Sequence, residues 1–170
     1  MTDTSNPATA TPIDPKTFWR MLGMRAVGVT VVTAQGDDGP AGFLALSATH
    51  VTADPPSMLV SIDDRTNALQ AVLRSRHFAI NYLSTADQGL ADLFGGRGPL
   101  KGTDRFEAGR WHTLATGAPA LVDAAGTIDC TLDETFRFHN TTIAVGRVVA
   151  FHMNESSDAL LFYRGQYRQV

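Results

Sequence analysis

Apolar residues recur at every second position along most of this chain, and at every third or fourth position in three shorter stretches. The first spacing is typical of strands and the second of helices. Strand-like patterns mark residues 28–35, 58–62, 77–83, 127–132, 142–152 and 160–163. They predict about six or seven strands against three helices, and therefore a mainly β domain. A barrel leaves few strand edges exposed, so it is the expected architecture.

Each predicted helix follows a residue that can cap it. Asp14 stands before Pro15, which suits the first helical position, Thr66 stands before the second helix, and Ser84 before the third, with Asp87 completing a variant of the capping box. The expected buried stripes are Phe18, Met21 and Leu22; Leu69, Val72 and Leu73; and Ala86, Leu90, Leu93 and Phe94.

Turn and strand signals give further expectations. The segment from Gly36 to Gly39 predicts a hairpin turn. Because consecutive strands usually pair, the first three strands are expected to form an antiparallel meander. Gly146 interrupts a long strand, which indicates a bulge or a close backbone approach. Cys130 alternates with polar neighbours and is expected to be a buried, unreactive thiol.

The stretch from Gly42 to Asp63 combines two kinds of sequence. Small hydroxyl residues alternate with alanines up to Ala53, so the backbone amides are left uncovered and a flat ligand can lie against the chain. Asp54 and two prolines then form a rigid corner before the buried strand 58–62. The alternative is an edge strand that leads into a tight turn.

Composition limits the classes of partner and the compartment. The chain has 170 residues, a 44% hydrophobic fraction and a net charge of −3, so one domain is expected and nucleic acid is not an expected partner. One cysteine excludes an internal disulfide and favours the cytoplasm. Residues 1–13 are expected to be a flexible tail and residues 14–170 a single domain, with no membrane span.

Reactive side chains do not form a recognisable catalytic motif. The five histidines lack metal-ligand spacing, no nucleophile elbow is present, and the glycine-rich segment 95–102 matches no phosphate-loop template. A bound cofactor is therefore expected to carry any reaction. Arg65 lies in the loop before the second helix, where it is either part of a phosphate site or a solvated surface charge.

Several blocks, in order, give the chain a resemblance to a known family. They are Gly28–Thr33, Gly42–Phe43 with Ser47, Thr49 and Asp54–Pro56, Phe78–Leu83 with Gln88, Asp104–Phe106 with Trp111, Gly117–Leu121, Ile128–Cys130, and Leu161–Tyr167. With these blocks the chain resembles the short-chain flavin reductases, the reductase components of two-component flavin monooxygenases. The resemblance covers about residues 18–167.

This resemblance implies a homodimer of Greek-key split β-barrels with a few peripheral helices. It implies bound FMN or FAD, NADH or NADPH as hydride donor, and a separate monooxygenase that receives the reduced flavin. The residues that it assigns to the flavin are Ser47, Ala48, Thr49, Ser61, Asp64, Arg65, Thr66, Asn81, Ser84 and Gln88. His139 is assigned to nicotinamide docking, with a strand-end histidine as the alternative.

Some positions depart from the family pattern. Leu44, Leu46 and His50 stand where many relatives have small polar residues, and Asn140–Thr141 replaces an Asp-His pair. Other functions therefore stay open: a flavin-dependent reductase of a corrinoid or a metal chelate, a non-catalytic flavin-binding electron carrier, or a barrel dimer without flavin.

Overall fold

A computed structural model describes residues 12–169, and residues 1–11 of the predicted tail lie outside this range. The α-helices are α1 (Pro15–Leu22), α2 (Asn67–Ser75) and α3 (Gln88–Phe94), and the short 3₁₀ helices are η1 (Thr85–Asp87) and η2 (Gly102–Arg105). The strands are β1 (Val27–Gly28), β2 (Thr30–Gly36), β3 (Gly39–Ala45), β4 (Thr49–Ala53), β5 (Pro56–Asp63), β6 (His77–Tyr82), β7 (Trp111–Thr113), β8 (Pro119–Leu121), β9 (Gly126–Phe138), β10 (Thr141–Met153), β11 (Leu160–Tyr163) and β12 (Gln166–Gln169).

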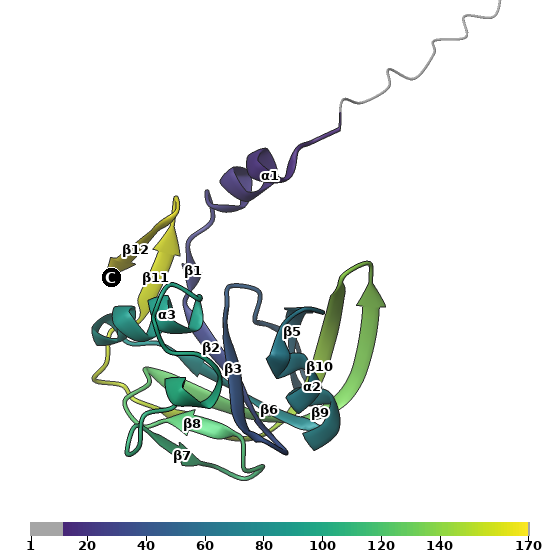
Figure 1. Cartoon of the computed structure of the whole chain (residues 1–170), viewed down its shortest axis with the longest axis vertical. Helices are drawn as coiled ribbons and strands as arrows, with labels where there is room; N and C mark the ends of the chain where they lie inside the picture. The colour runs from purple at the N-terminus through teal and green to yellow at the C-terminus, as the bar shows by residue number, and fades with distance from the viewer. Residues whose placement is uncertain (1–11, 170) are drawn as a thin grey trace, which may run out of the picture.

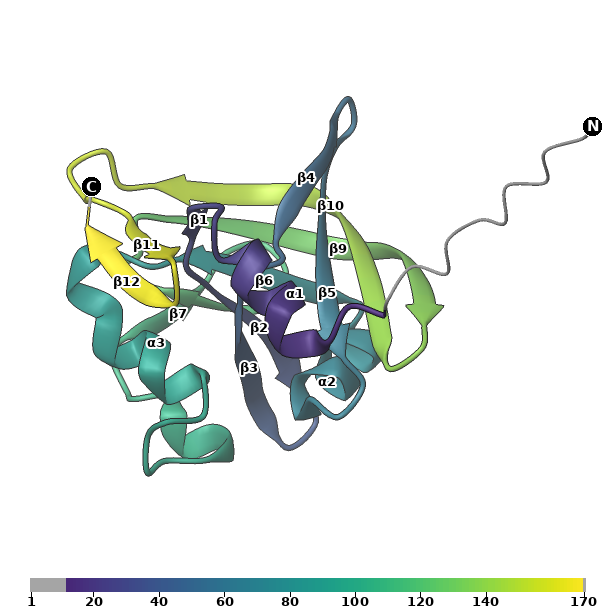
Figure 2. The same cartoon turned by 90° about the horizontal axis from the view of Figure 1, so that it is seen from above.

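The main sheet is antiparallel, and its strand order is β3-β2-β6-β9-β10-β5-β4. It curves around a common interior, and the small sheets β1-β11-β12 and β7-β8 complete the fold (Figure 1). This is the predicted mainly β split barrel with a few helices. Because each strand of the long β9-β10 ribbon has 13 residues, the ribbon extends past the body of the barrel (Figure 2).

Both faces of the central strands are buried, which explains why two hydrophobic clusters form. On β2, Val32 belongs to a cluster with Phe78, Ile80 and residues of α2. Val31 points to the opposite face, into a cluster that α3 supplies with Leu90 and other residues. Successive side chains of a strand point to opposite faces, so one strand contributes to both clusters. The two helices therefore pack on different faces of the same sheet.

A polar network crosses the buried part of the sheet around Asn81, which is 0% exposed. Its Nδ2 donates to the Val31 carbonyl at 3.1 Å and to Thr33 Oγ1 at 3.2 Å. Its Oδ1 accepts from the Leu121 amide at 2.8 Å and from Thr127 Oγ1 at 3.1 Å. A buried polar group must find partners inside the protein, and Asn81 does so by fastening β8 to β2, β6 and β9.

Local signals in the sequence predicted several features correctly. Asp14 caps α1 with Pro15 in its first turn, and Ser84 with Asp87 forms the capping box. The turn between β2 and β3 pairs Gly36 with Gly39, as predicted. These features depend on neighbouring residues only, so the sequence alone is sufficient to predict them.

The predictions for Gly146 and Cys130 are also confirmed. The register of β10 with β9 shifts between Val145 and Gly146, and a Cβ at Gly146 would lie 2.7 Å from the Phe78 ring. Cys130 is 0% exposed. Burial raises the pKa of its thiol to about 12, and the charges of Asp129 and Asp133 act in the same direction. The thiol therefore lacks the thiolate character that a nucleophile needs.

Long-range predictions were less successful. The predicted meander is wrong, because β3 and β4 lie at opposite edges of the main sheet and β5 pairs with β10. The strand count was too low, since residues 12–169 contain twelve strands. Ala86 is exposed and does not join the buried stripe of the third helix, because residues 85–87 form a separate 3₁₀ turn. Pairing partners far along the chain determine these features, and local patterns do not show them.

Helix α1 forms where it was predicted, but it buries none of its residues. Phe18, Trp19 and Met21 are 51%, 66% and 69% exposed. The helix projects from the barrel at the N-terminal end of the described chain (Figure 1). Within residues 12–169, no helix has the length and apolar character needed to cross a membrane.

Candidate functional site

The link between β3 and β4, residues 46–48, exposes backbone donors. The chain leaves one edge of the main sheet at Ala45 and joins the opposite edge at Thr49, so the link itself takes part in no ladder. Within residues 12–169, the amides of Ser47 and Ala48 donate to no backbone carbonyl. Unpaired backbone donors in a half-buried segment are suited to an anionic or carbonyl ligand.

Ser47 and Ser61 lie together at this link. Ser47 Oγ donates to the Ser61 carbonyl at 3.2 Å and accepts from the Ser61 amide at 3.3 Å. Ser61 is near the end of β5, and Ile143 of β10 is its partner on the other side. These bonds fix the link against β5.

The next segment, residues 63–66, connects β5 with α2. Arg65 donates from Nε and Nη2 to the Asp63 carboxylate at 2.9 and 2.8 Å, and the Arg65 amide donates to the same carboxylate at 2.9 Å. These hydrogen bonds, with the attraction of the guanidinium charge, lower the pKa of Asp63 to about 2. Thr66 occupies the N-cap of α2 without a capping side-chain bond, so its hydroxyl is not used there.

Asp64 connects this loop with the tip of the β9-β10 ribbon. Its amide donates to the Asn140 carbonyl at 2.9 Å, and its Oδ1 accepts from Thr142 Oγ1 at 2.8 Å. Its Oδ2 lies 3.0 Å from Arg137 Nη2. His139 is in the turn of the ribbon with φ +52° and packs edge-on against Phe138. The loop before α2 and the ribbon turn are therefore held side by side.

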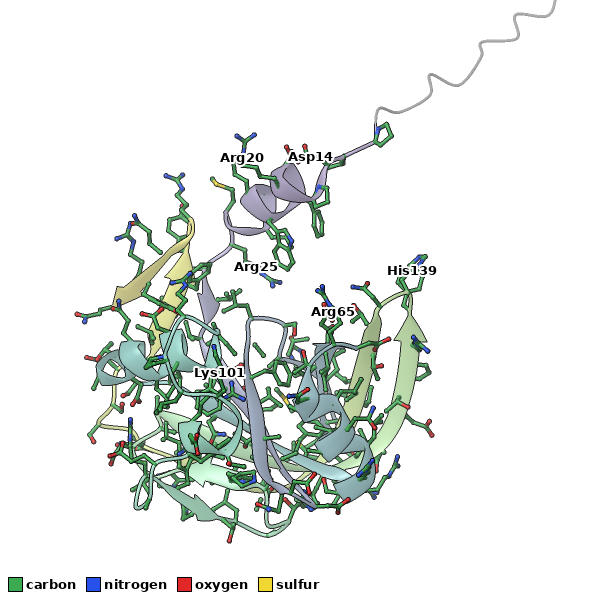
Figure 3. All side chains as sticks on the ribbon, viewed as in Figure 1. Asp14, Arg20, Arg25, Arg65, Lys101 and His139 are labelled. Carbon is green, nitrogen blue, oxygen red and sulfur yellow. The ribbon has the colours of Figure 1, made fainter. Side chains whose placement is uncertain are left out.

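Figure 3 shows Arg65 and His139 at the same open end of the molecule, with Arg25 directed toward that end from the segment between α1 and β1. The structure thus brings together seven of the predicted flavin residues and the predicted nicotinamide residue. They are Ser47, Ala48, Thr49, Ser61, Asp64, Arg65, Thr66 and His139. We call this group the rim site.

The other three predicted residues have different surroundings. Asn81 uses its amide in the buried network, and Ser84 donates to Asp87 at 2.6 Å within the capping box. Gln88 is exposed at the start of α3. The structure does not bring these side chains to the rim site. In the case of Asn81 and Ser84, burial and internal hydrogen bonds leave no polar atom for a ligand.

Comparison with known proteins places this chain in a family. Residues 22–170 match the model of the flavin reductase like domain. The chain belongs to the flavin reductase like family. A curated relative in Bradyrhizobium diazoefficiens, named FMN reductase (NADH) RutF, is 34% identical over 158 residues, which are 93% of this chain and 87% of the relative.

Solved structures of this flavin reductase family have the same fold. BorF, the flavin reductase component of a bacterial two-component tryptophan halogenase, is 30% identical with a TM-score of 0.85, over 92% of this chain and 98% of BorF. The NADH:FAD oxidoreductase SgcE6 of Streptomyces globisporus is 28% identical with a TM-score of 0.84, over 95% of this chain and 98% of SgcE6. The resemblance inferred from the ordered motifs is confirmed.

Two features of this flavin reductase were missed in the sequence. Arg137 reaches the loop before α2, although its strand-end position gave no signal of that contact. A hollow of about 740 Å³ with a mainly apolar lining opens beside β4 and β5. His50, Tyr82 and Phe151 are among its lining residues, and burial raises the pKa of Tyr82. Strands far apart in the sequence form this hollow, so no local motif marks it.

No cluster of three or more potential metal-ligating side chains occurs in the described part of the chain.

Proposed function

We propose that this chain is an NADH-dependent flavin reductase that binds FMN or FAD at the rim site and supplies reduced flavin to a separate monooxygenase. The free amides of Ser47 and Ala48 are the observation that carries this proposal. Relatives named for FMN and NADH, and a solved neighbour that is the reductase component of a halogenase, support the cofactors and the kind of partner.

The residues of the rim site fit a flavin. When bound, the flavin accepts hydride at its N5 atom and supplies the redox chemistry. The amides of Ser47 and Ala48 can donate to the edge of the ring on which negative charge develops, and the small side chain of Ala48 leaves the backbone accessible. Thr49 and Ser61 add hydroxyl groups beside this link. The chain therefore holds and stabilises the ring mainly with its backbone.

The phosphate end of the flavin is assigned to Arg65 and Thr66. Arg65 is 86% exposed, so its guanidinium is accessible, and the Thr66 side chain makes no capping bond at the start of α2. A guanidinium and helix-start amides are a favourable combination for a phosphate. Asp64 is assigned a positioning role, because its carboxylate already contacts Thr142 and Arg137.

The nicotinamide is assigned to the side of the rim site formed by the ribbon turn. His139 is exposed there, and the bonds from Asp64 hold the turn beside the flavin loop. Hydride transfer requires two planar rings in contact, so a fixed distance between these two segments is the contribution expected of the protein. Asn81 and Ser84 are not part of this proposal, and Gln88 contributes only if the flavin reaches α3.

A second copy of the chain is proposed to cover the apolar surface that one copy leaves exposed. This surface includes Phe18, Trp19 and Met21 of α1, and Phe136, Phe138, Phe151 and Met153 of β9 and β10. Exposed apolar residues in such number are typical of an interface. Sedimentation analysis is expected to give the mass of two chains, and a mass of one chain at micromolar concentration would contradict the homodimer.

An anaerobic titration tests the proposed activity. The protein is mixed with FMN or FAD, NADH or NADPH is added, and the absorbance of oxidised flavin near roughly 450 nm is followed. Rapid loss of absorbance with NADH is the expected result. Flavin binding without loss of absorbance with either nucleotide would contradict the reductase and would support an electron carrier.

A further inference from the structure

Two ion pairs lie next to each other at the proposed phosphate loop. Consecutive carboxylates form them: Asp63 accepts hydrogen bonds from Arg65, the shorter at 2.8 Å, whereas Asp64 Oδ2 lies 3.0 Å from Arg137 Nη2 as a charge contact without a hydrogen bond. The two guanidinium groups come from different parts of the chain, one from the loop before α2 and one from the end of β9. Both are mostly exposed, with 86% of Arg65 and 75% of Arg137 accessible to solvent.

These pairs leave the loop without net charge. Two carboxylates balance two guanidinium groups, so an approaching phosphate group meets attraction and repulsion at the same place. Arg65 is the more tightly held, because its side chain makes two hydrogen bonds to Asp63 and its backbone amide makes a third. A phosphate that binds Arg65 must therefore compete with Asp63.

We propose that Asp63 and Asp64 limit the affinity of the rim site for the flavin phosphate by competing for Arg65 and Arg137. This inference rests on the proposed function. Exposed ion pairs are weak individually, so a phosphate dianion can displace the carboxylates, but its repulsion by them reduces the net gain. The flavin is then bound loosely enough to leave after reduction, as a reductase that supplies another protein requires.

The two aspartates are not equivalent in this proposal. Asp63 is 37% exposed and its carboxylate bonds only to Arg65, whereas Asp64 is 21% exposed and its Oδ1 accepts from Thr142 while its Oδ2 faces Arg137. Asp64 therefore keeps a positioning role in addition to holding Arg137. Replacement of Asp63 is the cleaner test, because its side chain holds no other element of the fold.

The first test is Asp63→Asn. Asparagine keeps an oxygen that accepts from the Arg65 amide but removes the charge. The dissociation constants for FMN and riboflavin, which differ only in the phosphate, are measured by quenching of flavin fluorescence. The variant is expected to bind FMN about three- to tenfold more tightly, because one negative charge that repels the phosphate is removed from a solvated site. Its dissociation constant for riboflavin is expected to stay unchanged.

The matched control is Asp37→Asn. Asp37 forms an exposed ion pair with Arg74 at 3.1 Å, at the opposite end of α2, so the control makes the same change in total charge away from the rim site. Unchanged FMN affinity is expected. If Asp63→Asn leaves FMN affinity unchanged, or improves it no more than Asp37→Asn does, the competition does not exist.

A second pair of variants tests Arg137. Arg137→Gln is expected to weaken FMN binding several-fold without affecting riboflavin. Arg147→Gln, which breaks the 2.9 Å pair with Asp133 on the same ribbon, is expected to affect neither. Equal effects of Arg137→Gln on both flavins would overturn a phosphate role for Arg137. If the unaltered protein binds neither flavin, the proposed function itself fails. If it binds both flavins and Asp63→Asn has no effect, only the competition proposed here fails.

Discussion

The buried network around Asn81 and the rim site use polar groups in opposite ways. Asn81 is inaccessible to solvent, and its side-chain amide bonds to three neighbouring strands, β2, β8 and β9. At the rim site, the amides of Ser47 and Ala48 have no backbone partner among the described residues, and Arg65 holds only a neighbouring carboxylate. Burial explains the difference. A buried polar group must bond within the protein, whereas a group at the surface can bond to water or to a ligand instead.

This difference separates stability from binding. A polar side chain that is completely used inside the protein contributes to the free energy of folding, and its replacement should act on stability first. A polar group at the rim contributes little to folding and should act on ligand affinity. Replacements in the buried network are therefore expected to lower the free energy of unfolding, and replacements at the rim site are expected to change ligand affinity with little effect on unfolding.

The largest expected effect is that of Asn81→Leu. It removes hydrogen bonds to β2, β8 and β9 and leaves the Leu121 amide without its partner, so we expect a loss of about 3 kcal/mol in the free energy of unfolding. Urea unfolding measures it. Gln88→Ala, at an exposed position, is the control and should change the same free energy by less than about 0.5 kcal/mol. Similar values for the two variants would refute the distinction.

Arg65→Ala comes next and should act on binding. Loss of a charge-assisted contact to the phosphate is expected to weaken FMN binding about tenfold, while riboflavin binding and the urea midpoint change little. Fluorescence titration with both flavins measures this effect. Equal losses for FMN and riboflavin would show that Arg65 does not recognise the phosphate.

His139→Ala is expected to give a smaller effect, again on ligand binding and not on stability. The KM for NADH should rise about threefold with little change in flavin affinity, because an exposed side chain at one edge of the nicotinamide supplies only part of its binding. Steady-state kinetics at saturating FMN provides the measurement. An unchanged KM would assign His139 to the alternative of a strand-end histidine.

The smallest effect concerns the pH dependence of the rim. Since the folded pKa of Asp63 is lowered to about 2, the stabilisation by its pair with Arg65 is complete above the ordinary carboxyl value and is lost as the pH falls through about 2. The carboxyl carbon of Asp63, followed by NMR, should titrate near that value. In Arg65→Ala its pKa should rise toward the ordinary range, and a pKa unaffected by this replacement would contradict the assigned cause.

The sequence was sufficient for features that depend on neighbouring residues. The caps at Asp14 and Ser84, the turn after Gly36 and the burial of Cys130 follow from local preferences and alternation. The strand pattern predicted a barrel, and the family resemblance, carried by ordered motifs, then specified a split barrel. The chain alone did not predict that β3 and β4 lie at opposite edges, because strand pairing depends on residues far away in the sequence.

The same reason explains why the sequence alone left the surroundings of some site residues open. Asn81 alternates with apolar residues in a strand, and the sequence cannot tell whether its amide faces a ligand or a buried carbonyl. The structure shows that the amide faces buried partners. One of them is the Leu121 amide of β8, which lies 40 positions after Asn81 in the sequence. Arg137 was missed for a related reason, because it lies on β9, and α2, α3 and the strands β6, β7 and β8 stand between it and Asp64 in the sequence.

The single buried thiol of Cys130 makes this protein convenient for site-specific labelling. The chain contains one cysteine, and its inaccessibility and high pKa protect it from thiol reagents in the folded state. A cysteine introduced at exposed Asn140, in the ribbon turn, would therefore be the one site of modification. A fluorophore attached there would report directly on whether the turn moves when flavin or nicotinamide binds.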